Sequence, residues 1–234
     1  RGGRHHLACV AMLRTLRPHL PDTAERLGHH LRAAGDHEAA LDPLLEAAKQ
    51  RLERGDFDRV QNLMTERDEA MRSMGLSEAD PRWVAGQLLL TRALLTQGAY
   101  DAAEEPLSTC EQNALLPAQL AEVRRLRAEA LWQAGRMRQA IALAHEARQQ
   151  FEAIGDLRGA ADCRRIAAVC HLEGTGDHTA ALEETRAARR RYLASQDLDR
   201  LADCDYLEGK VLVDMGDLQA GREAVLAAQR RHRS

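Results

Sequence analysis

Histidine and cysteine residues at several places in the chain have the chemistry of metal ligands. The pairs His5–His6 and His29–His30 each place two imidazoles side by side in the sequence. Adjacent residues on a helix point about 100° apart, so neither pair can share one ion well. Cys163, Cys170 and His171 are better spaced, because residues seven apart share a helix face. However, they fall at positions that the repeat described below assigns to packing or to a groove, and we expect no metal site.

Other stretches resemble catalytic or ligand-binding motifs, but each lacks an essential residue. His145–Glu146 begins like a zinc-protease motif, yet Gln149 stands where the second histidine is required. "GTGDHT" at 174–179 lacks the third glycine and the preceding strand of a dinucleotide-binding turn. "DLDRLADCD" at 197–205 has Ala202 where a calcium loop needs glycine. With no phosphate-binding loop or nucleophile elbow either, we expect neither catalysis nor a cofactor.

The charge pattern disfavours nucleic acids and membranes as partners. The basic stretches are "RAARRR" at 186–191 and "QRRHRS" at 229–234, and in the first Arg186, Arg189 and Arg190 share one helix face. The whole chain nevertheless has 33 basic against 36 acidic residues and only 3% aromatics, which leaves little for phosphate binding or base stacking. No apolar run reaches the roughly 20 residues of a membrane span. Five cysteines without a C-x-x-C pair suit a reducing compartment, and we expect the cytoplasm.

The elements that carry these residues should all be helices, and they repeat. Ala, Leu, Glu, Gln and Arg dominate every long segment, whereas strand signals are scarce. The pattern small-x-x-Leu-x-x-x-Gly-x-x-x-x-small-x6-small occurs five times with fixed internal spacing. Its glycines are Gly35, Gly98, Gly135, Gly176 and Gly216. The sequence therefore predicts an all-α fold built from repeated units.

Each position of the repeat has a mechanical role, as "LWQAGRMRQAIALAHEA" at 131–147 shows. Gly135 can take a positive φ and end the first helix, while Ala140 and Ala147 let two helices approach closely. One such pair leaves an apolar face exposed, and stacking the pairs covers it. The spacing predicts antiparallel helix pairs, with about 12 helices in the whole chain.

This pattern resembles the tetratricopeptide repeat (TPR), which has a small residue, an aromatic or Leu, a Gly and then two alanines at this spacing. The family's tryptophan in the first helix is missing, and its aromatic is Leu throughout. Successive glycines from Gly98 onward lie 37, 41 and 40 residues apart, which is similar to long-repeat TPR variants. The resemblance covers residues 79–234. It implies a right-handed TPR-like superhelix, an α-solenoid, with about four helix pairs and a concave face lined by first helices.

Residues 1–78 are less regular and contain one TPR-like unit. We expect one helix over 36–56, another over 57–72, and a helix start at Asp80 and Pro81. "TAERLGHHLRAAGDHEAALDPLLEAAKQ" is similar to the helical region that follows an ATPase module and opens a TPR array in bacterial signalling proteins. Such arrays are carried by multidomain serine/threonine kinases and by STAND-type regulatory ATPases.

Counting from the small residue of each repeat, the resemblance identifies the positions that would face a partner in the groove. They are Arg92, Arg125, Glu129, Trp132, Cys170, Tyr206 and Lys210. Trp132 is the strongest candidate, because it follows the structural Leu131 and because aromatic side chains anchor partners. The alternative is that Trp132 packs against the next repeat. The lysine and asparagine of the chaperone-tail TPR clamp are absent, which argues against a terminal carboxylate as ligand.

These observations favour a non-catalytic interaction and regulatory module of a larger bacterial signalling protein. Its partner would be a protein or a peptide, including another domain of the same chain. Because the sequence starts at Arg1 rather than methionine, we expect it to be a piece of a longer protein. The resemblance implies that a kinase or ATPase domain precedes it. The alternative is a transcription regulator whose array senses a peptide or a small effector. A third hypothesis is a hydrolase or metal site formed in the groove.

Overall fold

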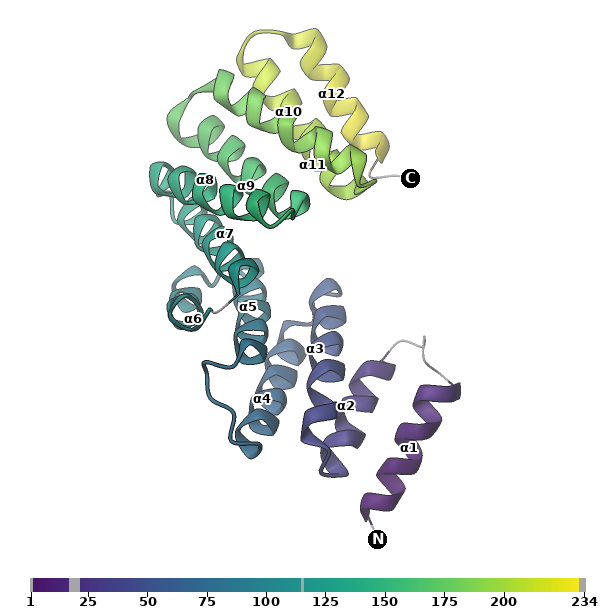
Figure 1. Cartoon of the computed structure of the whole chain (residues 1–234). Helices are drawn as coiled ribbons and strands as arrows, with labels where there is room; N and C mark the ends of the chain where they lie inside the picture. The colour runs from purple at the N-terminus through teal and green to yellow at the C-terminus, as the bar shows by residue number, and fades with distance from the viewer. Residues whose placement is uncertain (1, 17–21, 115, 232–234) are drawn as a thin grey trace. The chain divides into compact units, whose positions relative to one another are not determined.

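The computed structural model describes residues 2–16, 22–114 and 116–231, and these residues form helices joined by short turns (Figure 1). The α-helices are α1 (Gly2–Leu16), α2 (Thr23–Ala33), α3 (His37–Glu53), α4 (Phe57–Ser73), α5 (Pro81–Thr96), α6 (Tyr100–Asn113), α7 (Pro117–Gln133), α8 (Met137–Ala153), α9 (Leu157–Cys170), α10 (His178–Ala194), α11 (Leu198–Asp214) and α12 (Leu218–Arg231). A π-helical turn, η1 (His171–Thr175), extends α9. The all-α prediction is confirmed. None of the helices in the described ranges is long and apolar enough to cross a membrane.

The chain divides into two compact units, and each is described by itself. Residues 1–115 form the N-terminal unit, with α1–α6, and residues 116–234 form the C-terminal unit, with α7–α12. The predicted boundary between residues 78 and 79 marks a change in repeat regularity rather than in compactness, and it stays a prediction. Residues 232–234 of the predicted basic stretch lie outside the described residues.

The N-terminal unit is built around the apolar faces of α2, α3, α4 and α5. One buried cluster joins these helices, and its largest aliphatic members are Leu31, Leu44, Leu63 and Leu89. The helices predicted over 36–56 and 57–72 are confirmed as α3 and α4, and α3 runs unbroken through Pro43. The predicted helix start is also confirmed, because the Asp80 side chain accepts a hydrogen bond from the backbone N–H of Arg82 at 2.9 Å.

The C-terminal unit consists of the helix pairs α7–α8, α9–α10 and α11–α12, and each helix packs against the next along the chain (Figure 1). Ala140, Ala144 and Ala147 of α8 are all 0% exposed, which confirms that they are contact points between helices. The backbones of α11 and α12 approach so closely that a Cβ atom on Gly209 would lie 2.9 Å from the Gly221 carbonyl oxygen. Small residues therefore set the distance between paired helices.

The turns between helices follow the predicted chemistry. The five repeat glycines, Gly35, Gly98, Gly135, Gly176 and Gly216, all have φ between 68° and 90°, a region that glycine enters at little cost. Aspartates begin four of the following helices, since each accepts a hydrogen bond from the backbone N–H three residues ahead. These caps are Asp156, Asp177, Asp197 and Asp217. The turns thus end one helix and start the next within a few residues.

Candidate partner-binding face

Two side chains, from the first helices α7 and α11 of the C-terminal unit, meet at the carboxylate of Glu173. The Trp132 indole N–H of α7 donates to Glu173 Oε2 at 3.2 Å. The Lys210 ammonium of α11 lies 3.6 Å from Glu173 Oε1. Glu173 belongs to η1, so the contact joins α7, the end of α9 and α11. Two of the predicted groove residues, Trp132 and Lys210, are therefore brought together.

The π turn that carries Glu173 accommodates one additional residue. The interval from the N-cap Asp156 to Gly176 is one residue longer than the interval from Asp197 to Gly216 in the next helix pair. A π turn absorbs such an insertion without ending the helix, and it shifts the side chains that follow it. Glu173 lies within this turn, and its carboxylate contacts both Trp132 and Lys210.

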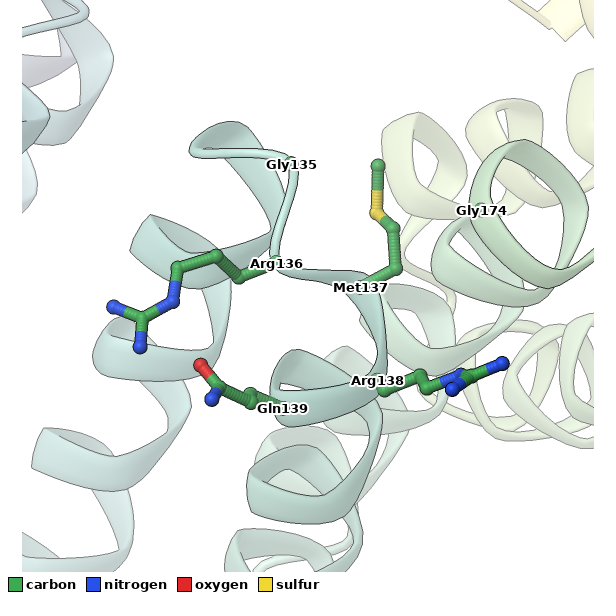
Figure 2. A pocket seen from close by; sticks show the side chains of 6 residues that line it. All are labelled: Gly135, Arg136, Met137, Arg138, Gln139 and Gly174. Carbon is green, nitrogen blue, oxygen red and sulfur yellow. The ribbon is translucent and has the colours of Figure 1, made fainter.

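A close contact holds η1 against the turn between α7 and α8. Met137, the first residue of α8, reaches toward the segment that carries Gly174 (Figure 2). A Cβ atom on Gly174 would collide with the Cβ and Cγ atoms of Met137, so only glycine fits there without movement. The position of Glu173 is consequently fixed by packing next to it as well as by its hydrogen bond.

Trp132 packs against the next repeat, as one of the two alternatives required, and it also stays partly exposed. Its side chain packs against buried clusters that include Ile166 of α9, Val169 of α9 and Leu172 of η1. It also remains partly exposed, with its indole N–H in an exposed contact. An aromatic ring that is anchored on one side and accessible on the other is suited to partner binding.

Arg125 and Glu129 belong to an ion triplet along α7. The Arg125 guanidinium donates to Glu122 at 2.7 and 2.8 Å and to Glu129 Oε2 at 3.1 Å. The side chain of Arg125 is only 10% exposed, whereas that of Glu129 is 27% exposed. Burial opposes the charge of Arg125, but Glu122 and Glu129 outweigh it and raise the pKa of the guanidinium. Arg125 therefore orients Glu129 and offers little surface itself.

On α11, Tyr206, Lys210 and Val213 form an exposed stripe, because residues three and four apart lie on one helix face. Tyr206 is 53% exposed and Val213 is 42% exposed. Exposed aromatic and aliphatic side chains beside a cation can contact a partner of mixed character. We call Glu129, Trp132, Glu173, Tyr206 and Lys210 the Trp132 face.

The remaining predicted groove residues lie elsewhere. Cys170 is 0% exposed in the core beneath α7, and burial raises the pKa of its thiol to about 12, so it packs rather than meets a partner. Arg92 is exposed on α5 in the N-terminal unit. Sequence reasoning missed Glu173, although a signal was present. Glu173 follows Leu172 in the repeat as Trp132 follows Leu131.

An open pocket of about 470 Å³ lies beside η1. It is lined by Gly135, Arg136, Met137, Arg138, Gln139 and Gly174. Arg136 and Arg138 point in opposite directions from the α7–α8 turn (Figure 2). They do not converge on one point, and the lining holds no acid, base or nucleophile that suggests catalysis. In the described part of the chain, no three His, Cys, Asp or Glu residues are arranged to hold a metal ion.

The sequence matches no protein-family model and no curated protein. The fold, however, is similar to those of solved TPR-like repeat proteins. BtubC (BKLC) from P. vanneervenii has a TM-score of 0.64 and 19% identity over 99% of this chain and 90% of its own. A Rap protein complexed with Competence and Sporulation Factor has a TM-score of 0.66 and 14% identity over 95% of this chain and 69% of its own.

A Podosopora anserina kinesin light chain with nearly identical TPR-like repeats has a TM-score of 0.58 and 15% identity, over 82% of this chain and 94% of its own. Likenesses at these identities concern the fold alone. Together with the twelve helices in the described residues, they show that the chain has a TPR-like α-solenoid fold.

Proposed function

We propose that this chain is a non-catalytic module that binds a protein or peptide through the Trp132 face. One observation carries the proposal: Trp132, Glu173 and Lys210, from three successive helical segments, meet at an exposed site with Tyr206 one turn away. A surface that combines anchored aromatic rings with oriented charges is typical of protein recognition. The TPR-like neighbours support this reading, since their repeats belong to a fold that generally serves protein interaction.

We further propose that the module acts in the cytoplasm as part of a larger bacterial signalling protein with a kinase or ATPase domain. The support is the similarity of its N-terminal stretch to regions that open TPR arrays in such proteins. The alternative is a factor-sensing array of a transcription regulator, which the likeness to a Rap protein complexed with a factor favours. The full open reading frame discriminates between them. A kinase catalytic loop or a phosphate-binding loop supports the first, and a helix-turn-helix supports the second.

The binding proposal is tested by affinity capture with the whole chain from lysates of the source cells. Trp132→Ala and Tyr206→Ala should each remove the captured partner, because they delete the aromatic anchors. Tyr206 is exposed, so its loss should leave far-UV helicity unchanged. Glu146→Gln, at an exposed position on α8, is the control and should capture normally. Equal capture by all variants would contradict the proposal.

A further inference from the structure

The Trp132 face carries more acid than base around its central ring. Glu129 precedes Trp132 by three residues on α7, so it lies on the same helix face, and Glu173 accepts a hydrogen bond from the indole N–H. The Glu173 side chain is 41% exposed. Arg125, which holds Glu129, is buried and also pairs with Glu122, so the triplet of these three residues keeps a net negative charge. Lys210 is thus the one cation among the five residues of the face.

Two carboxylates near one aromatic ring suit a guanidinium group. The planar guanidinium can stack on an indole face while its N–H groups donate to carboxylates in fixed directions. Such charge-assisted bonds are stronger than those between neutral groups. An incoming carboxylate would instead meet Glu129 and Glu173, and only Lys210 would attract it.

Resting on the proposed function, we infer that the Trp132 face binds an arginine side chain of a basic partner segment. The guanidinium stacks on the exposed part of Trp132 and donates to Glu173 and Glu129. Tyr206 contacts the neighbouring part of the segment, since it lies one turn before Lys210 on α11. The guanidinium, which is a stronger and bidentate donor, replaces the exposed Lys210 ammonium at Glu173.

This inference makes opposite predictions for two residues in direct contact. Glu173→Gln removes a carboxylate that receives the guanidinium, so the affinity for a basic segment should fall by about tenfold. Lys210→Gln removes a competing cation, so the affinity should rise by about threefold. For an acidic segment both signs would be reversed. Because both side chains are partly exposed, neither substitution should change the far-UV helicity.

The test measures fluorescence anisotropy of a short, blocked, labelled peptide of alternating arginine and alanine with the whole chain. A peptide with citrulline in place of arginine has the same shape without the charge, and a glutamate–alanine peptide reverses the charge. We expect the arginine peptide to bind at least about tenfold more tightly than the other two. Glu173→Gln should weaken this binding, Lys210→Gln should strengthen it, and the matched control Glu146→Gln should leave it unchanged.

The outcomes separate the two levels of the proposal. Equal binding of the arginine and citrulline peptides, with loss of both in Trp132→Ala, would overturn the arginine inference but leave the binding face intact. Preference for the glutamate peptide, or weakening by Lys210→Gln, would likewise overturn it. If wild type, Trp132→Ala and Glu173→Gln bound the arginine peptide with the same affinity, the peptide would bind elsewhere on the chain. That result would contradict both the arginine inference and the proposed binding face.

Discussion

One partly buried carboxylate in each unit differs from the other in the direction of its pKa shift. In the N-terminal unit, burial raises the pKa of Asp68 on α4 to about 6, and Arg67 and Arg72 only partly oppose this effect. In the C-terminal unit, burial also disfavours ionisation of Glu184 on α10, but Arg164 and His145 outweigh it and lower the pKa to about 2. Arg164 lies 2.7 Å from Glu184. The carboxylate of Glu184 is therefore paired with cations, whereas that of Asp68 is poorly compensated.

The same contrast holds for the buried arginines. Arg67 of the N-terminal unit is 1% exposed and donates to the Leu41 carbonyl and to the Met71 sulfur. Arg125 of the C-terminal unit donates to two carboxylates. The first helices also differ in length: α2 has 11 residues, whereas α7 and α11 each have 17. The Trp132 face thus joins two helices of equal length, α7 and α11, with the π turn that follows the shorter α9.

The largest expected effect is that of Arg125→Leu, which removes the cation between two carboxylates in a partly buried site. The free energy of unfolding of the C-terminal unit should fall by about 3 kcal/mol. Arg67→Met, by contrast, removes a buried charge that has no carboxylate hydrogen bond, and it should change stability by less than about 1 kcal/mol. Urea unfolding read from Trp132 and Trp83, one in each unit, measures the two effects separately. Equal losses of the free energy of unfolding in Arg125→Leu and Arg67→Met would contradict the difference between the two buried arginines.

Glu184→Gln should cost the C-terminal unit about 2 kcal/mol at pH 7, because it removes the carboxylate from Arg164 and His145. The folded pKa is lowered from 4.5 to about 2, so this stability is present above pH 4.5 and is lost as the pH falls toward 2. Urea unfolding at a series of pH values should show the difference between variant and wild type shrinking below pH 4.5. A difference that is independent of pH would show that Glu184 acts through packing instead.

Asp68→Asn should have the opposite sign and a smaller size than Glu184→Gln. The folded pKa of Asp68 is raised from 3.8 to about 6, so its favourable contribution is present below pH 3.8 and is lost as the pH rises through 6. Asparagine keeps the acceptor for Gln87 but removes the charge. At pH 7 the variant should be more stable by about 1 kcal/mol, a value reduced for partial exposure. The prediction would be contradicted if the free energy of unfolding of the N-terminal unit depended more steeply on pH in the variant than in wild type.

The fold could be predicted because its determinants are local in the sequence. Gly135 and Asp177 specify a turn and a cap, and Ala140 marks a helix contact, whatever lies around them. The residues of the candidate face were harder to predict, because the neighbouring helices decide whether a side chain is exposed. Cys170 falls at a groove position by counting, but α9 packs that side chain into the core. Glu173 meets Trp132 through a π turn, whose single additional residue shows in the sequence only after the intervals are compared.

The most direct test of the central claim is photo-crosslinking of the whole protein in its source cells. A photoreactive aromatic residue is placed in turn at Tyr206 in the Trp132 face, at Arg92 in the N-terminal unit and at Glu146 on α8, all of which are exposed. We predict an adduct with a discrete partner from position 206 that disappears when Trp132→Ala is added. Adducts from position 92 or 146 with none from position 206 would contradict the assignment of the binding face.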